Sequence, residues 1–404
     1  MENTDMKKIL FCFWLIAFCF LIVGCDALNM NSSNTDGKGS ESLKFVLSED
    51  KNSYVVAGIG KHKGKDLVIP DEYNGKPVTA VDEMAFYNCK QIESITIGKN
   101  ITQFGTSAFK NCGNVKEILY NAKNALPMEY CTPFENCGDY YTGLKLVIGK
   151  DVEKIPDNMF ASEFLQSVTI SELVFEEGSN CKAIGNNAFG SSLLVYDLTL
   201  PEGLEKIGEE AFTQCSEFIR ISLPATLKEI GYDAFSDAFR VVELYNPSSV
   251  KIIAGNLDNG RIAQNNPVIH TNKNATSIIK TKNDFWFCTK EGSARLLAYV
   301  GTEKSIVLPD SYEGKSYEIE SWAFEQTYIE SVTIPAAVNK IGTYAFYGCQ
   351  KLKYVNFADP IGWNYRTYSS SKPLEASDLR DSVRAAEMLT GIYDSYTWIK
   401  GSGN

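Results

Sequence analysis

Few side chains in this 404-residue chain are placed to do chemistry. The chain has two histidines, His62 and His270, and neither lies at a metal-ligand spacing from a second candidate ligand. His62 falls in the mostly polar run 58–65, which is typical of a hairpin turn, and His270 ends the strand-like segment 268–270. We therefore expect both histidines on the surface or at a sheet edge, and neither as a catalytic base.

The acidic residues and the known catalytic motifs lead to the same expectation. The pairs Glu176-Glu177 and Glu209-Glu210 fall in turns between predicted strands, where solvated charge is the simpler interpretation. A glycosidase needs two carboxylates that face each other across a cleft, and the sequence singles out no such pair. The sequence also contains no G-x-S-x-G, H-E-x-x-H or P-loop motif. We expect no catalytic residues, no metal site and no cofactor, and a protein that is not an enzyme.

A short phrase that recurs nine times organises the chain. Its clearest copies have Ala-Phe followed by a Cys three residues after the Phe, and they occupy 84–89, 107–112, 210–215 and 344–349. Weaker copies centre on Phe134, Phe160, Phe189, Phe235 and Phe324. Successive Phe positions from Phe86 to Phe235 are separated by 23, 25, 26, 29, 23 and 23 residues, and Phe324 and Phe346 by 22. A period of this length is the signature of a leucine-rich repeat solenoid.

Each repeat predicts one coil of such a solenoid. After the phrase come three apolar positions, and the last two alternate with a polar residue, as in Ile92, Ile95 and Ile97. A turn with Pro or Gly follows, and then a second apolar pair such as Leu204 and Ile207. We expect the Phe to fill the interior and the Ala to let neighbouring coils approach. One coil cannot bury its apolar side alone, so the coils must stack into a continuous core.

This coil resembles the repeat of BspA-like leucine-rich repeat proteins, which reads roughly L-x-x-I-x-I-P-x-x-V-x-x-I-G-x-x-A-F-x-x-C. The match is strong over about residues 67–247 and 306–357, and two similar openers begin at Leu67 and Ile306. We expect a mostly β fold with short turns and helices: a leucine-rich repeat solenoid in two arrays, with β-hairpin openers and a C-terminal helical cap. The resemblance further implies a surface protein that adheres to host or bacterial partners.

The cysteines follow the repeat. Of the eleven, eight remain when Cys12, Cys19 and Cys25 are set apart with the amino terminus. Five of the eight lie three residues after the repeat Phe: Cys89, Cys112, Cys137, Cys215 and Cys349. Ser, Ala or Thr fills this ladder position in other coils, so we interpret it as a small buried residue, a role that a free thiol suits. Disulfides between stacked coils are the alternative, although bridging needs a specific side-chain geometry.

The amino terminus is typical of an exported lipoprotein. Lys7 and Lys8 precede Ile9–Val23, an apolar run of 15 residues that is short for a membrane span and fits the core of a signal peptide. The run leads into Gly24-Cys25, which resembles a bacterial lipobox with Cys25 as the lipid-bearing first residue of the mature chain. The alternative is an ordinary signal peptide with an incidental Cys. The following segment, to residue 42, is rich in Asn, Ser, Asp and Gly and is predicted to be a flexible tether.

The charge of the chain excludes one class of partner. The net charge is −11, and the sequence contains no cluster of Lys or Arg residues. Nucleic-acid binding requires a basic surface that neutralises phosphates, so we exclude it. Adsorption to anionic lipid is disfavoured for the same reason. We expect contact with the membrane through a lipid anchor only.

The exposed strand positions are where a binding function would lie. The residue between the last two apolar positions forms an outward column across the coils: Thr96, Leu119, Val147, Thr169, Thr199, Ser222, Tyr245, Thr333 and Asn356. Intrinsic strand preference explains Thr and Tyr there equally well. If a protein binds, the energy should concentrate in large side chains, and the candidates are Leu119, Tyr196, Arg220, Tyr245 and Tyr354. Replacing Tyr196, Arg220 and Tyr245 by Ala should then weaken adhesion while thermal stability stays nearly constant.

The chain divides into six expected parts. They are a signal peptide (1–24), a tether (25–42), a hairpin with the first array (43–247), a connector (248–284), a second hairpin and array (285–357), and a cap (358–404). The cap should hold a helix from Ser377, with one apolar face made of Leu379, Val383, Ala386, Leu389 and Ile392. Trp363, Tyr393 and Trp398 should complete the cap, because terminal repeats must be shielded from solvent.

These observations predict a non-enzymatic, lipid-anchored protein on the outer surface of a bacterium. It would bind a host or bacterial protein or matrix macromolecule through its strand face. A protein that binds or processes glycans, with Tyr and Trp as stacking platforms, is the alternative. Four tryptophans lie in the predicted openers and cap rather than in the strand column, which favours protein binding: Trp286, Trp322, Trp363 and Trp398.

Overall fold

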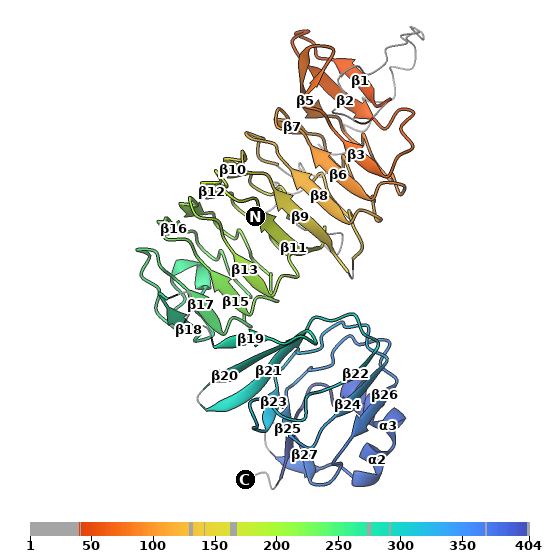
Figure 1. Ribbon diagram of the computed structural model, residues 1–404, viewed down its shortest axis with the longest axis vertical. Helices are drawn as coiled ribbons and strands as arrows, with labels where there is room; N and C mark the ends of the chain where they lie inside the picture. The colour runs from red at the N-terminus through yellow and green to blue at the C-terminus, as the bar shows by residue number, and fades with distance from the viewer. Residues whose placement is uncertain are drawn as a thin grey trace, which may run out of the picture. The chain divides into compact units, whose positions relative to one another are not determined.

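The computed structural model describes residues 40, 42–128, 132–140, 142–161, 168–272, 275, 277–290, 292–367 and 370–401. The predicted signal peptide, Cys25 and the tether up to residue 39 lie outside this part of the chain. Within it, the protein is a mostly β solenoid of stacked coils with a short helical C-terminus, and the predicted fold class is confirmed (Figure 1). Among the described residues, no helix has the length and apolar character needed to cross a membrane.

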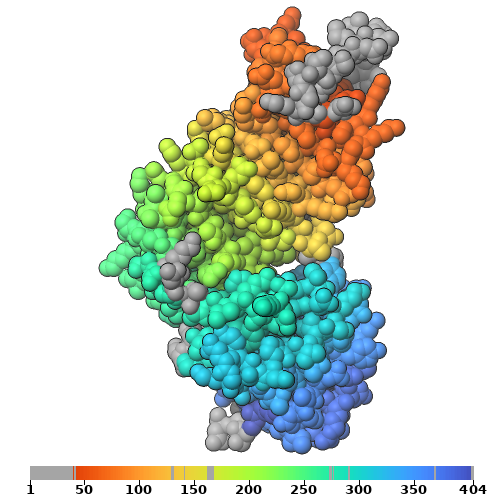
Figure 2. Space-filling view, in the orientation of Figure 1, coloured from red at the N-terminus to blue at the C-terminus, as the bar shows by residue number. Residues whose placement is uncertain are grey.

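One side of the first array is the strand face, to which each coil contributes a short parallel strand. Its first sheet has the order β11-β9-β8-β6-β3. These strands are β3 (Asp66–Val68), β6 (Ser94–Ile97), β8 (Glu117–Tyr120), β9 (Leu144–Ile148) and β11 (Ile170–Phe175). A second sheet continues the face with β13 (Asp197–Thr199), β15 (Arg220–Ser222), β17 (Glu243–Tyr245) and β18 (Val268–His270). Figure 2 follows the same succession of coils from orange to green, with neighbouring coils in contact.

The other side of each coil contributes a two-residue strand to another parallel sheet. This sheet contains β10 (Lys154–Ile155), β12 (Ala183–Ile184), β14 (Lys206–Ile207) and β16 (Glu229–Ile230). A Gly follows several of these Ile residues because the coils come very close here. A Cβ atom at Gly231 would lie 2.5 Å from the backbone of Gly208 in the preceding coil.

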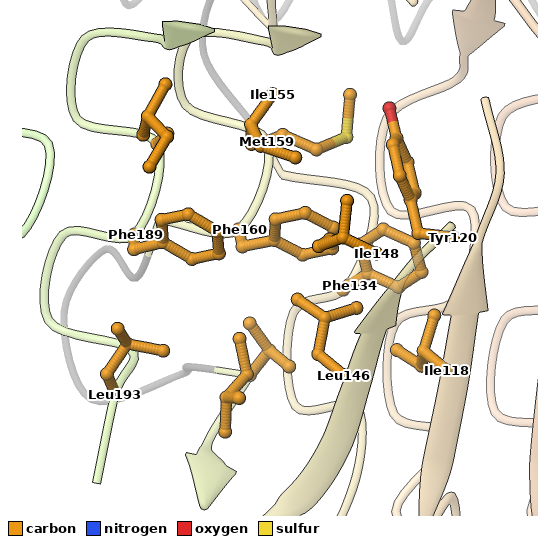
Figure 3. Close-up of a cluster of buried hydrophobic side chains, with 14 of the residues drawn as sticks. Ile118, Tyr120, Phe134, Leu146, Ile148, Ile155, Met159, Phe160, Phe189 and Leu193 are labelled. Atoms are coloured by element: carbon orange, nitrogen blue, oxygen red, sulfur yellow. The ribbon is translucent and has the colours of Figure 1, made fainter. Parts of the chain in front are cut away.

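The repeat Phe residues form a single stack through the core of the first array. Neighbouring rings from Phe86 to Phe235 are stacked with centroids 5.0–5.5 Å apart. Figure 3 shows Phe134, Phe160 and Phe189 in this row, with strand-face residues on one side and Ile155 and Met159 on the other. Burying each ring stabilises the fold by roughly 1.5–3 kcal/mol, and aromatic pairing adds about 0.5–1.5 kcal/mol, so burial is the larger effect. The Phe period thus fixes how the coils stack.

Each Ala-Phe phrase is a tight turn with left-handed residues on both sides of the Phe. Two residues after the Phe, φ is 59° at Asn88 and 63° at Asn111, and Asn adopts this conformation at low cost. Two residues before the Phe, the left-handed conformation is also adopted by residues for which it is less favourable, including Trp322 (φ 65°) and Tyr344 (φ 56°). The turn aims backbone groups at the next coil: the N–H of Phe86 donates to the carbonyl of the next repeat Ala at 2.8 Å.

Both predicted hairpins are present. Each belongs to a sheet of its own on the side of its array opposite the strand face. β1 (Lys44–Leu47) and β2 (Tyr54–Gly58) are antiparallel, and β2 pairs in parallel with β5 (Lys76–Val81). β4 (Glu72–Tyr73) and β7 (Gln103–Phe104) also pair with β5. The second hairpin joins β20 (Phe285–Lys290) to β21 (Ser293–Tyr299), and β21 pairs in parallel with β23 (Tyr317–Ile319). The second array repeats the plan, with strands β22 (Ser305–Val307), β24 (Ser331–Ile334), β26 (Tyr354–Phe357) and β25 (Val338–Ile341).

The strand face is interrupted between β11 and β13, and one predicted column position is wrong there. β11 pairs with β9 so that Val174 lies beside Val147, and Thr169 is buried before the strand begins. The prediction failed because 168–170 and 173–175 both have apolar residues at their first and third positions, and a bulge after Ile170 gives the outward place to the middle residue of the second segment.

The next coil explains the interruption itself. Its first two core positions, Leu193 and Leu198, are five residues apart, whereas Phe218 and Ile221 in the following coil are three apart. The extra residues displace β13 from β11. On the strand face of the described residues, a single isolated bridge between Ile170 and Leu193 connects these two coils.

The segment that was expected to be a connector contributes to the first array. β18 pairs in parallel with β17, with His270 beside Tyr245, so the strand face continues to residue 270. The carbonyl of Gly260 accepts the N–H of Phe235 at 2.8 Å, as the repeat Ala does in other coils. A short 3-10 turn (Asn259–Arg261) surrounds Gly260. β19 (Ile278–Lys280) then pairs with β20.

The C-terminal cap differs from the prediction in one respect. The predicted single helix is divided into α2 (Ala376–Arg380) and α3 (Ser382–Glu387) by Asp381, whose carboxylate caps α3 by accepting from the N–H groups of Val383 and Arg384. A π-helical turn (Met388–Ile392) follows. Leu379, Ala386 and Leu389 are buried, but Val383 and Ile392 are about half exposed, because the break rotates them off the predicted apolar face.

The predicted aromatic residues pack in the cap, and three strands that the sequence did not predict complete it. Trp363 and Trp398 are fully buried in the core of the second array, and Tyr393 packs against it. They lie on or beside β27 (Trp363–Arg366) and β29 (Thr397–Lys400), and β28 (Ser371–Pro373) pairs with β27. β29 pairs antiparallel with both β25 and β27, so the last coil does not leave its sheet edge open.

Candidate functional site

The first sheet of the strand face presents an outward row that we call the aliphatic row. Its members are adjacent Cα partners on five neighbouring strands: Val68, Thr96, Leu119, Val147 and Val174. All five are partly buried, while the residues on either side of them along each strand point mostly into the core. Of the predicted candidates, Leu119 lies at the centre of this row.

A polar row runs beside the aliphatic row on the same face. Its members are Asp66, Ser94, Glu117, Lys145 and Glu172, again adjacent Cα partners. Lys145 and Glu172 form an ion pair at 3.4 Å. At the rim, Glu93 binds both Lys116 and Lys65, and these two hydrogen bonds, that of Lys116 first, lower the pKa of Glu93 to about 2. Ion pairs on this face thus join Lys145 to Glu172 within the row and Glu93 to two lysines at its rim.

The second sheet of the strand face is covered by the second hairpin. A small apolar cluster joins the two arrays: Ile219, Ile278, Trp286, Cys288, Leu297 and Ala298. Tyr196 packs against this cluster, and Arg240 lies 5.8 Å from the centre of its ring. Burial, and then the nearby Glu217 carboxylate, raise the pKa of the Tyr196 phenol. Tyr196 thus makes a contact between the two arrays within the chain.

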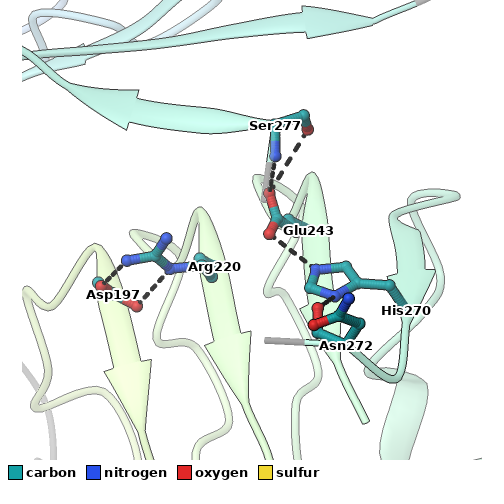
Figure 4. Close-up of polar contacts among 6 residues, drawn as sticks. All are labelled: Asp197, Arg220, Glu243, His270, Asn272 and Ser277. Atoms are coloured by element: carbon teal, nitrogen blue, oxygen red, sulfur yellow. Dashed lines mark hydrogen bonds and ion pairs between the residues drawn. The ribbon is translucent and has the colours of Figure 1, made fainter. Parts of the chain in front are cut away.

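Arg220 is engaged in the same way. Its Nε donates to Asp197 at 2.9 Å (Figure 4). Its guanidinium lies 5.7 Å from the centre of the Trp286 ring. Tyr196 and Arg220 are therefore engaged in contacts within the chain, and their removal is now expected to lower stability. The reason is a contact between segments far apart in sequence, which the repeat pattern does not encode.

The other two candidates lie apart from these. Tyr245 on β17 is partly buried, with its ring 5.8 Å from that of His270. Tyr354 on β26 belongs to the second array, is about half exposed, and lines a pocket of about 300 Å³ with Val383 and Glu387 of α3. The five candidates therefore do not form one continuous site.

His270 has a structural environment rather than a catalytic one. Its Nε2 lies 2.8 Å from the buried carboxylate of Glu243, and its Nδ1 lies 2.7 Å from the carbonyl oxygen of Asn272. The other oxygen of Glu243 accepts from the backbone N–H of Ser277 at 3.1 Å (Figure 4). Both ring nitrogens are thus occupied, and Ser277 faces Glu243 rather than the imidazole. These contacts bind β18 and the chain before β19 to β17.

Two carboxylates that the sequence did not single out face one pocket. Glu217 lies just before β15 in the first array, and Glu325 follows the repeat Phe324 of the second array. Both line a pocket of about 400 Å³ with Tyr196 and Glu303. Arg240 forms an ion pair with Glu217 and donates to the carbonyl oxygen of Leu297 at 2.9 Å. Burial, and then the proximity of Glu217, raise the pKa of Glu325 to about 7. A cationic group placed beside Glu325 would favour the charged form of this carboxyl, so the pocket is suited to receive one.

The ladder cysteines are reduced, as predicted. Cys89, Cys112, Cys137, Cys215 and Cys349 are free and buried, while Cys131 lies outside the described residues. No group of three or more His, Cys, Asp or Glu side chains in the described part of the chain is arranged to hold a metal ion.

The coil geometry agrees with a known repeat family. The family model described as "BspA type Leucine rich repeat region" matches in six copies, over residues 65–181, 182–257 and 304–387. These stretches cover more than half of the chain. The protein belongs to the BspA-type leucine-rich repeat family. The break between β11 and β13 lies within the coils of this BspA-type match.

Solved structures give distant similarities to this BspA-type chain. A leucine-rich repeat protein from Bacteroides ovatus is 21% identical, with a TM-score of 0.37, and the match covers 78% of this chain and 70% of that one. A leucine rich cell surface protein from Faecalibacterium prausnitzii is 20% identical, with a TM-score of 0.28, over 81% and 77% of the two chains. No curated protein matches the sequence.

Sequence reasoning missed two features of the BspA-type array, each for its own reason. The interruption at Leu194 is local to its coil, whereas the carboxylate pair of Glu217 and Glu325 depends on how the two arrays pack. The first left a readable signal, the five-residue step from Leu193 to Leu198. The second left none, because its two members come from different arrays.

Proposed function

We propose that the protein is a lipid-anchored, non-enzymatic protein of the bacterial cell surface that binds a protein partner through the aliphatic row. The amino-terminal pattern that ends at Cys25 supports the anchor and the location. The family supports the type of function, because extended solenoid faces commonly bind other macromolecules. The partner's identity is not part of the proposal.

The observation that carries the proposal is the aliphatic row itself. Five partly exposed positions in register on adjacent strands make a continuous strip, bordered by a polar row in which Lys145 pairs with Glu172 and Ser94 donates to Asp66. A partner centred on the strip would leave this polar row at the rim of the interface, where charges stay accessible to solvent. Interface energy concentrates in a central apolar patch surrounded by polar residues, and Leu119 occupies that central place.

A charge placed in the row tests the proposal. Leu119→Lys with Val147→Glu should weaken adhesion of protein-coated beads to a cultured cell monolayer roughly tenfold or more. Val307→Glu is the matched control, because Val307 is an exposed β-branched residue on β22 of the second array. Both proteins should melt like the wild type. Undiminished adhesion by the folded double variant would remove the aliphatic row as the binding surface.

One observation favours glycan binding as a second candidate function. Trp322 and Tyr344 stack with ring centroids 4.7 Å apart, and the exposed Tyr347 ring meets Trp322 edge-on at 5.4 Å. Aromatic platforms with polar tips suit the apolar faces of sugar rings. If this platform binds glycans, Tyr347→Ala should abolish binding on a glycan array while Tyr87→Ala, at the same repeat position of the first array, does not. Equal signals from both variants and the wild type would exclude the platform.

A further inference from the structure

The interruption of the strand face leaves a strand with one unpaired edge. β11 pairs with β9 on one side, but β13 does not pair with it on the other. Among the described residues, no backbone hydrogen bond joins 171–181 to 195–203. Ser171 and Glu172 on β11 are exposed. The N–H and C=O groups of such an edge are a template for another extended chain.

A groove runs along this unpaired edge. It has a volume of about 370 Å³ and is lined on one side by Ser171, Glu172 and Leu173, and on the other by the displaced segment 194–197. Trp286 and Val300 of the second hairpin, with Lys280, close it. Trp286 is more than nine-tenths buried, and its indole Nε1 has no hydrogen-bond partner in the described part of the chain. A buried donor without an acceptor is costly, and a peptide carbonyl would relieve that cost.

The groove continues into the acidic pocket described above. The two cavities share Ser171, Leu194, Tyr196 and Val300 as lining residues. Three carboxylates line the pocket, those of Glu217, Glu303 and Glu325, and none of its described lining residues is Lys or Arg. Arg240 does not line the pocket, but its ion pair with Glu217 compensates the charge of that carboxylate. The pocket therefore complements a cationic side chain, for which charge-assisted hydrogen bonds are the strong ones.

We propose that an extended segment of a partner protein adds to the unpaired edge of β11 as a strand, and that a Lys or Arg side chain of this segment enters the pocket of Glu217, Glu303 and Glu325. Strand addition gives affinity through main-chain hydrogen bonds, and pockets for alternate side chains give specificity. This site adjoins the aliphatic row at β11, which carries Val174 of that row. Leu119 and Val147, which test the row, lie on β8 and β9, whereas Ser171 and Glu303 test the groove and the pocket, so each proposal can fail without the other.

A panel of synthetic peptides tests the proposal on the full mature protein. The probes are acetylated, amidated octapeptides of alternating Thr and Val, with a single Lys moved along the sequence, and the readout is fluorescence anisotropy. At least one register should bind saturably, and the same peptide with Glu in place of Lys should bind tenfold or more weakly. If no register shows saturable binding in titrations that reach about 1 mM, the proposal is overturned.

Two protein variants and a backbone readout locate the binding. Ser171→Trp fills the groove beside the strand edge, and Glu303→Lys reverses an exposed charge in the pocket; each should weaken binding at least tenfold. Glu49→Lys, an exposed site in the β1–β2 turn, is the matched charge control and should bind like the wild type. Bound peptide should slow amide hydrogen exchange within 171–175. Binding that leaves this exchange unchanged, or that survives Ser171→Trp in a protein that melts normally, would overturn strand addition.

Discussion

The Sγ atom of Cys215 lies 3.2 Å from the carbonyl oxygen of Phe189, one coil earlier in the stack. Cys112 and Cys349 make the same contact with Phe86 and Phe324, at 3.1 and 2.9 Å. The thiol thus donates a weak hydrogen bond across the coil boundary. At the same ladder position, the hydroxyl of Ser192 donates to the carbonyl oxygen of Phe189 in its own coil, at 2.9 Å. The ladder position therefore selects a small residue, with a donor as an added but dispensable benefit.

The ladder thiols should be free and unreactive in the native protein. Burial raises the pKa of Cys112 and Cys215 to about 12, so little thiolate forms at neutral pH. A thiol reagent should label almost none of the ladder cysteines in the native, unreduced mature protein, and close to eight cysteines after denaturation. Cys112→Ala should lower the free energy of unfolding by about 1 kcal/mol or less, whereas loss of a disulfide would cost about 2–5 kcal/mol. A denatured count near zero would contradict the reduced ladder.

Lipidation at Cys25 is tested by fractionation. Cys25→Ser should release the protein from the membrane fraction, because a cleaved or short apolar run does not hold a protein of this size in the bilayer. Metabolic labelling should place lipid on the wild type and not on the variant. Unchanged fractionation together with an unlabelled wild type would rule out the anchor.

The contact between Glu325 and Glu217 should make stability depend on pH. The pKa of Glu325 is about 7 in the folded protein, above its ordinary 4.5, because of burial and the Glu217 carboxylate; Arg240 opposes this in part. Between these two pH values the folded state holds a proton that the unfolded state has lost, so the free energy of unfolding falls as pH rises. Glu325→Gln should reduce the loss of melting temperature between about pH 5 and about pH 8. Identical pH profiles for variant and wild type would exclude this contribution.

Tyr120 offers a stabilising substitution. Its side chain is fully buried against the Phe stack, and its hydroxyl has no hydrogen-bond partner among the described residues (Figure 3). An unsatisfied buried polar group costs about 1–3 kcal/mol, so Tyr120→Phe should raise the melting temperature. Phe104→Leu, beside the same ring, is the control for a simple change of packing and should lower it. A lower melting temperature for Tyr120→Phe would show that the hydroxyl is satisfied, for example by a bound water.

Local patterns made most of the fold predictable, and contacts between coils made the remainder unpredictable. The Phe period placed the stack, and apolar alternation placed strands such as β6 and β8, because each coil needs the same residues at the same offsets. Thr169 was misplaced because two nearby segments, 168–170 and 173–175, both have apolar residues at their first and third positions. Val383 was misplaced because Asp381 can serve either inside the first turn of a helix or as its N-cap.

The candidate site was predictable only where it depends on one coil. Leu119 points outward, as alternation along its own strand requires. Tyr196 and Arg220 point outward too, but the second hairpin covers them, and that contact joins segments whose sequences carry no common pattern. The Glu325 carboxyl is buried by the same contact. Exposure of a strand residue is thus a property of the whole chain, even when its direction is local.

The step from Leu193 to Leu198 has a consequence for how such proteins diversify. The insertion separates β11 from β13, yet β12 still pairs with both of its neighbours on the opposite side, and the Phe rings on either side stay stacked at 5.4–5.5 Å. Length changes on one side of a coil are therefore tolerated without loss of the coil stack. The outward surface can therefore change coil by coil while the stacked Phe rings keep the coils together.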